Sequence, residues 1–223
     1  MKPEVLADAG AVARAAVDLI REVAGHSLAM RGVFRLVLAG GSTPGRAYEM
    51  LADTVTDWNG WQFYLGDERC LPVDHPERNS VMLRQTLFDQ VAVTEEQLHM
   101  IPAELGAEMG AAAYEKEVRP ALPFDLVLLG LGEDGHTASL FPGHEHPEDR
   151  LAVPVHHAPK PPPDRISLNY GALCSAGTVL FLVSGAGKHH ALDRWQRQGD
   201  IPAARIQGRE RTLLLADEAA MHG

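Results

Sequence analysis

Apolar residues recur along the chain in two alternating patterns. Over residues 4–30 they return every three or four positions, which predicts an amphipathic helix. Short continuous apolar runs that end in polar or glycine residues predict strands at 33–41, 61–69, 123–132, 178–188 and 212–217. Helix-like stretches lie between them, at 44–51, 79–91, 106–118 and 187–198, with a short piece at the C-terminus. This alternation predicts an α/β fold with a mostly parallel sheet covered by helices on both faces.

Two local signals refine this pattern. Thr94 and Gln97 have the spacing of a capping box, which predicts the start of a short helix. The stretch HHAPKPPPDR at 156–165 contains too many prolines for a helix, so we expect an exposed loop before a short strand, RISLN. Nothing else resembles a linker and no repeat is visible, so we expect a single domain over residues 1–223.

Composition narrows the class of protein. The chain has 223 residues, of which 45% are hydrophobic, and a formal net charge of −10, which favours a packed core and disfavours a broad nucleic-acid surface. No apolar run is long enough for a membrane span, and the acidic start MKPEVLADAG lacks a signal-type apolar core. Cys70 and Cys174 fit neither a disulfide framework nor a zinc spacing, so we expect a reduced, cytoplasmic setting.

Four polar, glycine-containing loops follow the predicted strands: AGGSTP, LGDERC, GLGEDGH and SGAGK. The carboxyl ends of parallel strands share one edge of a sheet, which is where such folds bind ligands. We therefore expect these loops to meet there and to form the site.

The first loop, GGSTP, is typical of either an anion site or an ordinary turn. Ser42 or Thr43 suits a helix N-cap and Pro44 the first helical position, while the free N–H groups around Gly41 would attract a phosphate. The loop lacks the G-x-x-x-x-G-K-[ST] pattern of nucleotide-triphosphate binding.

The second and fourth loops supply charge. Asp67, Glu68 and Arg69 follow a strand directly, which indicates either a polar site or a surface ion pair, and Asn79 could cap the next helix. Lys188 is expected in the first turn of a helix, where a cation opposes the helix dipole unless an anion lies beside it. A tolerated, exposed lysine is the other interpretation.

The third loop contains the spacing G-x-G-x-x-G at Gly130, Gly132 and Gly135. A dinucleotide site is disfavoured, because Glu133 and Asp134 would repel a diphosphate and no suitable acidic residue follows a second strand.

The same turn instead presents Asp134 and His136. A histidine held by a carboxylate is a natural general base, although a lone histidine here would be a plain helix cap. The remaining histidines lack metal-ligand spacing, so no metal is expected.

The four loops, in this order, resemble the 6-phosphogluconolactonase family. The matching segments are LAGGSTP (38–44), LGDER (65–69), ERNS (77–80), GLGEDGHTASLFPG (130–143), RISL (165–168) and SGAGK (184–188). The resemblance implies a Rossmann-like three-layer α/β/α domain that hydrolyses 6-phospho-D-glucono-1,5-lactone without a metal or organic cofactor.

On this resemblance we assign roles to the candidate residues. The catalytic candidates are His136 as the base, Asp134 as its orienting carboxylate, Arg69 for the developing charge or the phosphate, and Asp67. The phosphate candidates are Gly41, Ser42, Thr43, Arg69, Arg165 and Lys188. The expected partner is a small phosphorylated sugar lactone, with neither nucleic acid nor membrane, and the chain is expected to be a monomer or weak dimer.

Two other functions were weighed against lactone hydrolysis. Glucosamine-6-phosphate deaminase/isomerases share GGSTP and a DGH loop, but they typically carry D-E-Y and an acidic residue five positions after the histidine, where this chain has Arg69 and Phe141. A sugar-phosphate sensor would need a DNA-binding segment, and no basic helix-turn-helix is visible. Asn169 and the proline-rich loop depart from the family pattern and leave the role of Arg165 open.

Overall fold

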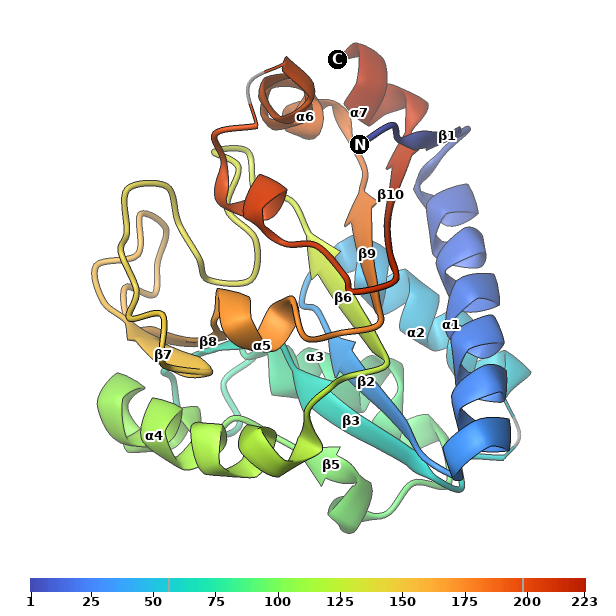
Figure 1. Cartoon of the computed structure of the whole chain (residues 1–223), viewed down its shortest axis with the longest axis vertical. Coiled ribbons are helices and arrows are strands. Elements are labelled where there is room, and N and C mark those ends of the chain that lie inside the picture. The colour runs from blue at the N-terminus through green and yellow to red at the C-terminus, as the bar shows by residue number, and fades with distance from the viewer. Residues whose placement is uncertain (56, 198) are drawn as a thin grey trace.

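A parallel sheet forms the central layer of the molecule in the computed structural model, which describes residues 1–55, 57–197 and 199–223 (Figure 1). Within those residues seven strands pair in the order β1-β10-β9-β6-β2-β3-β5, every neighbouring pair parallel. Their bounds are β1 Glu4–Leu6, β2 Phe34–Leu38, β3 Trp61–Leu65, β5 Leu98–His99, β6 Leu126–Gly130, β9 Thr178–Val183 and β10 Arg211–Asp217.

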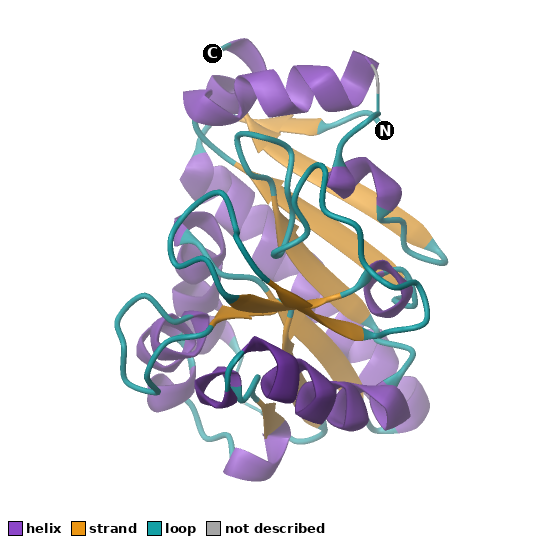
Figure 2. Cartoon of the chain, turned by 90° about the vertical axis from the view of Figure 1, so that its left-hand side faces the viewer, coloured by secondary structure: helices purple, strands orange, loops and turns teal. Residues whose placement is uncertain are grey.

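Helices and a second, small sheet cover the two faces of this sheet. On one face α1 (Ala9–Arg31) packs against α2 (Ser42–Thr54), β9 and β10. On the other face lies an antiparallel sheet in the order β4-β8-β7, against which α4 (Ala107–Val118) packs (Figure 2). The predicted three-layer α/β/α fold is confirmed.

The remaining elements complete the layers. The small sheet consists of β4 (Asp67–Arg69), β7 (Ala152–Val155) and β8 (Arg165–Leu168). The other helices are α3 (Asn79–Thr86), α5 (Tyr170–Leu173), α6 (His189–Arg197) and α7 (Glu218–His222). The helices α6 and α7 pack on each other near the two chain ends (Figure 1).

The strand order reverses between β2 and β6. From β2 the chain builds outward through β3 to β5, and from β6 it builds the other way through β9 to β10. The loops that leave β2 and β6 therefore turn away from each other and open a crevice at the carboxyl ends of the strands, which is where parallel α/β folds bind ligands.

Two buried tyrosines hold the strand ends beside this crevice. The Tyr48 hydroxyl accepts from the Ala39 N–H at 2.9 Å and donates to the Ala39 carbonyl at 3.0 Å, just past β2. The Tyr114 hydroxyl makes the same pair of bonds with Leu65 at the end of β3, both at 2.9 Å. Burial raises the pKa of both phenols, which therefore stay protonated and able to donate.

Several predicted boundaries were wrong. The N-terminal helix does not begin at Glu4: Glu4–Leu6 pairs with β10, and α1 begins at Ala9 because the Asp8 side chain accepts from the Ala11 N–H. The predicted strand at 61–69 is divided at Gly66 between the two sheets. The predicted strand at 178–188 ends at Val183, and a 3₁₀ turn, Ala186–Lys188, follows it.

Other boundaries moved less. The helix expected at 79–91 ends at Thr86, and a 3₁₀ turn covers Phe88–Gln90. The helix expected at 187–198 spans His189–Arg197, and residue 198 lies outside the described residues. The capping box of Thr94 and Gln97 is confirmed at a 3₁₀ turn, Glu95–Gln97.

We predict that Tyr48→Phe and Tyr114→Phe each lower the free energy of unfolding by about 1–3 kcal/mol, because each leaves a buried N–H and carbonyl without their partner. Tyr64→Phe is the matched control, since its ring is also buried but its hydroxyl bonds to no described residue. Urea unfolding monitored by fluorescence measures all three. Equal losses in the three variants would contradict the role given to the two hydroxyl groups.

Candidate active site

A cavity of about 390 Å³ opens at the carboxyl ends of β2, β3, β6 and β9. This volume lies within the range of small-molecule sites, about 300–1,000 Å³. The four loops expected to meet do meet here, together with the loop between β7 and β8. Nearly all the candidate residues line the cavity, namely Gly41, Ser42, Thr43, Asp67, Arg69, His136, Arg165 and Lys188. Asp134 stands behind His136.

The histidine and its carboxylate form a close pair. His136 Nδ1 lies 2.5 Å from Asp134 Oδ1, and the same oxygen accepts from the His136 backbone N–H at 3.1 Å. Burial alone would raise the pKa of Asp134, but the backbone N–H, the charge and the ring N–H of His136 outweigh it and lower that pKa. Because an ionised Asp134 can only accept, Nδ1 of His136 carries the proton and donates it to the carboxylate. Nε2 is then the basic nitrogen of the ring.

Glycines allow this turn to close tightly. A Cβ on Gly132 would stand 2.1 Å from His136 Nδ1, so no side chain fits beneath the ring. Gly135 has φ +92°, and a Cβ there would press into Ile201. Two glycines of the spacing that resembled a dinucleotide fingerprint are thus required by packing, Gly132 against the ring of His136 and Gly135 against Ile201.

Phe141 packs against the ring of His136. The two ring centroids lie 4.6 Å apart, and Phe141 is buried. An apolar ring therefore stands at the position where the isomerases typically carry an acidic residue.

Asp67 lines the cavity, and its side chain joins three segments of the chain. Its Oδ2 accepts from Ser139 Oγ at 2.6 Å, and its Oδ1 accepts from Asn79 Nδ2 at 3.2 Å. Ser139 in turn receives support from β8, since its N–H donates to Ser167 Oγ at 3.2 Å. Both oxygens of Asp67 are thus engaged, so this geometry favours a positioning role over direct proton transfer.

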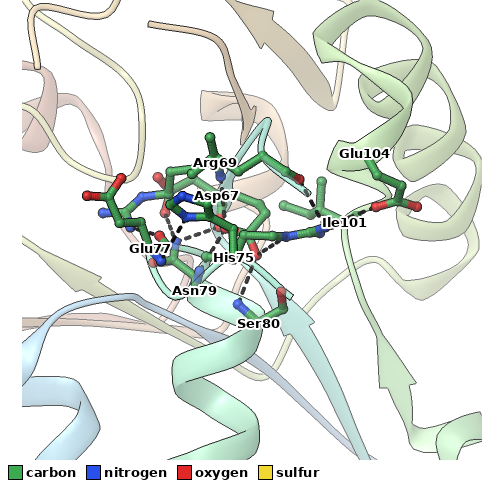
Figure 3. Close-up of polar contacts among 11 residues, drawn as sticks. Asp67, Arg69, His75, Glu77, Asn79, Ser80, Ile101 and Glu104 are labelled. Carbon is green, nitrogen blue, oxygen red and sulfur yellow. Dashed lines mark hydrogen bonds and ion pairs between the residues drawn. The ribbon is translucent and has the colours of Figure 1, made fainter. Parts of the chain in front are cut away.

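Glu68 is fully buried, and its side chain caps the N-terminus of α3 although it lies eleven residues before that helix in the sequence. Its carboxylate accepts from the N–H groups of Asn79 at 2.7 Å, Ser80 at 2.8 Å and Arg69 at 2.8 Å (Figure 3). Arg78 Nε lies 3.4 Å from the same carboxylate. The expectation that Asn79 caps α3 was wrong, because Asn79 is the first helical residue and its side chain serves Asp67 instead.

The Glu68–Arg78 pair holds both ends of the segment that carries Arg69. Arg78 also bonds to Glu104 at 3.2 Å and to the Ile101 carbonyl at 3.1 Å, while Arg69 donates to the Glu77 carbonyl (Figure 3). Arg69 therefore reaches the cavity from a rigid frame.

The N-terminus of α2 faces the cavity with free donors. The helix begins at Ser42 with Gly41 as its N-cap, and no side chain caps it. Ser42 and Thr43 were therefore not the caps we expected, and Pro44 is the third rather than the first helical residue. The first N–H groups of this 13-residue helix remain available to an anion.

The cations that line the cavity differ in their burial and in how many hydrogen bonds they already make. Arg165 is 6% exposed and donates from Nε and Nη2 to the carbonyls of Pro162, Lys160 and Pro161 at 2.9–3.2 Å. Lys188 ends the Ala186–Lys188 turn just before α6, rather than lying in the first turn of that helix. Burial lowers the pKa of its ammonium group, although the charge of Glu133 opposes this.

Sequence reasoning overlooked two cavity-lining residues. Lys160 lines the cavity from the proline-rich loop, and its Nζ lies 3.3 Å from Glu133 Oε2. Ser184 lines it at the end of β9, where its Oγ is buried without a hydrogen-bond partner among the described residues. Lysine among prolines gave no local signal of a site, since only the fold brings that loop over the cavity.

These features define a parallel α/β protein with a histidine–aspartate pair in a pocket lined by cations. Residues 7–215 match a family model described as glucosamine-6-phosphate isomerases/6-phosphogluconolactonase, and the chain belongs to this family.

Individual relatives agree with this assignment. The chain is 38% identical to the 6-phosphogluconolactonase of Streptomyces coelicolor, over 92% of this chain and 87% of the relative. It is 36% identical to that of Homo sapiens, over 85% and 80%. The crystal structure of 6-phosphogluconolactonase from Thermotoga maritima superimposes with a TM-score of 0.88 at 32% identity, covering 96% of this chain and 98% of the other.

The described residues contain no group of three or more His, Cys, Asp or Glu side chains placed to hold a metal ion. None of their helices combines the length and apolar character needed to cross a bilayer.

We predict that Arg78→Met lowers the free energy of unfolding by about 3–5 kcal/mol, because it leaves the buried Glu68 charge without its cation. Arg84→Met is the control, since Arg84 forms an exposed pair with Glu95, a kind worth about 0–1 kcal/mol. Urea unfolding of both variants measures the difference. A loss no greater than that of Arg84→Met would show that the buried pair does not hold this frame.

Proposed function

We propose that this chain hydrolyses 6-phospho-D-glucono-1,5-lactone to 6-phospho-D-gluconate, the second step of the oxidative pentose phosphate pathway. The observation that carries the proposal is the His136–Asp134 pair at 2.5 Å in a cavity lined by cations. Membership of the family and the names of the relatives support the same reaction.

Water is the nucleophile in this proposal. His136 Nε2 takes a proton from water as its oxygen attacks the lactone carbonyl carbon, C1, and Asp134 stabilises the imidazolium that forms. The tetrahedral intermediate then expels the ring oxygen, which receives the proton from His136. Atoms and charge balance, and the histidine returns to its neutral form.

Cations stabilise the charge on the substrate. Arg69 faces the cavity from its rigid frame and would stabilise the developing oxyanion or the phosphate. The N–H groups of Ser42 and Thr43 and the ammonium of Lys188 would bind the phosphate, with Arg165 beside them. Binding this remote group holds C1 against His136, so that binding energy is used for positioning.

Deamination of glucosamine 6-phosphate is the alternative that the sequence left open. Phe141 supports the hydrolase, because its buried ring lies against His136 at the position where the isomerases typically carry a carboxylate, so this chain lacks that acid. No observation in the structure favours a non-catalytic sensor.

We further propose that residues 1–223 act as one catalytic domain, as a cytoplasmic monomer or weak dimer, on a small phosphorylated lactone, without nucleic acid or membrane. The net charge of −10 supports the absence of a nucleic-acid partner. Light scattering of the purified chain measures the oligomeric state.

We predict that His136→Ala lowers kcat for lactone hydrolysis by about 10²–10⁴-fold and leaves the fold intact, because it removes the general base. Asp134→Asn should lower kcat as well, since an amide cannot stabilise an imidazolium. The assay generates the lactone in situ and subtracts its spontaneous hydrolysis. His26→Ala, on the exposed side of α1, is the control. Turnover near that of the control would rule out His136 as the base.

We predict that affinity for 6-phosphogluconate falls as the pH rises through the lowered pKa of Lys188, because the neutral amine no longer attracts the phosphate. Below that pKa the ammonium is charged and binding is at its strongest. Lys188→Arg should bind with little change over the same interval, since a guanidinium stays protonated. Calorimetric titrations across the alkaline range test this, and identical pH profiles for the two proteins would contradict it.

A further inference from the structure

The loop between β7 and β8, residues 156–164, lies over the cavity and is called the strap here. Its two ends are tied together, since His156 Nδ1 lies 2.8 Å from Asp164 Oδ1 and the Ala158 N–H donates to the Pro163 carbonyl at 2.9 Å. His156 Nε2 also lies 3.2 Å from Glu108 of α4. The strap is therefore anchored at its base.

The middle of the strap is held by Arg165. The guanidinium donates to three successive carbonyls, those of Lys160, Pro161 and Pro162. The hydrogen bonds between this guanidinium and the described residues engage Nε and Nη2. Arg165 can therefore offer a phosphate Nη1, but not its full fork. Arg165 acts here as a positioning residue that places Lys160 and Pro161 in the cavity wall.

The charge of Lys160 has only a weak partner. Its Nζ lies 3.3 Å from Glu133 Oε2, and both side chains are more than half exposed, 54% and 59%. Ion pairs this exposed contribute little and are readily exchanged. Lys188 lines the same cavity, and burial lowers the pKa of its ammonium group although the nearby charge of Glu133 acts to raise it. Among the described residues only Lys160 forms an ion pair with Glu133, and Lys188 lies further from that carboxylate.

We propose that Lys160 is a specificity-determining residue, whose ammonium group leaves Glu133 and pairs with the phosphate of the bound lactone. Glu133 holds that charge in place while the site is empty, and a phosphate dianion completes the neutralisation of Lys160 and Lys188. This inference rests on the proposed function for the identity of its substrate, but the anion contact itself depends only on the arrangement of these three side chains.

Steady-state kinetics on two substrates test the proposal. Lys160→Ala should raise KM for the phosphorylated lactone by about 5- to 20-fold, with a much smaller change in kcat. This is near the lower end for the loss of one hydrogen bond to a charged group, because the side chain of Lys160 is more than half exposed. The rise should be confined to the phosphorylated substrate, with glucono-1,5-lactone as the comparison. Lys160→Arg should restore most of the loss. Glu133→Gln should lower KM by about two- to fivefold, because the competing partner is removed.

Lys116→Ala is the matched control, since Lys116 is an exposed lysine of α4 that does not line the cavity. A KM for Lys160→Ala equal to that of this control would overturn the proposal. An equal rise of KM for both lactones would also overturn it, because that result would assign Lys160 to the shape of the strap rather than to the phosphate.

A binding measurement separates this proposal from the proposed function. If the unmodified protein hydrolyses neither lactone, the proposed function fails, and calorimetric titration with inorganic phosphate then decides the role of Lys160. Weaker phosphate binding by Lys160→Ala than by Lys116→Ala, by about 5- to 20-fold, would support the contact. Equal binding by the two variants would overturn it.

Discussion

The arrangement of the site depends on one buried carboxylate, that of Asp67. Asp67 is 8% exposed and begins β4, where the chain has just left the main sheet. Its two oxygens bind Asn79 at the start of α3 and Ser139 in the loop after β6. Three elements far apart in the sequence therefore meet at one charge. Ser139 lies only three residues after His136, so this contact also sets where the imidazole of His136 stands relative to Arg69.

The site concentrates positive charge on a chain that is acidic as a whole. The net charge is −10, yet Arg69, Lys160, Arg165 and Lys188 all line one cavity. Local fields in a partly enclosed cleft are set by the nearest charges and by helix ends rather than by the total. A small anionic ligand would thus be attracted by a small region, and the acidic remainder disfavours long polyanions.

Close packing around His136 limits which residues its loop can hold. The ring of His136 contacts both the Gly132 backbone and Phe141 and is bonded to Asp134. Only a glycine admits the ring at this distance, and the aromatic contact replaces the acid of the isomerase pattern. The same loop in the two branches of the family can therefore support different chemistry with few changes.

Apolar periodicity and short-range turn patterns are local properties of the chain. They were enough to predict the fold class, the edge at which the loops meet and the pairing of Asp134 with His136. Three features follow from the folded chain instead. Residues 61–69 are divided between two sheets because β4 pairs with β8, Glu68 caps α3 from a position eleven residues before the helix, and the β7–β8 pair carries the loop of Lys160 to the cavity. None of these contacts follows the period of a helix or strand, so the sequence pattern carries no signal of them.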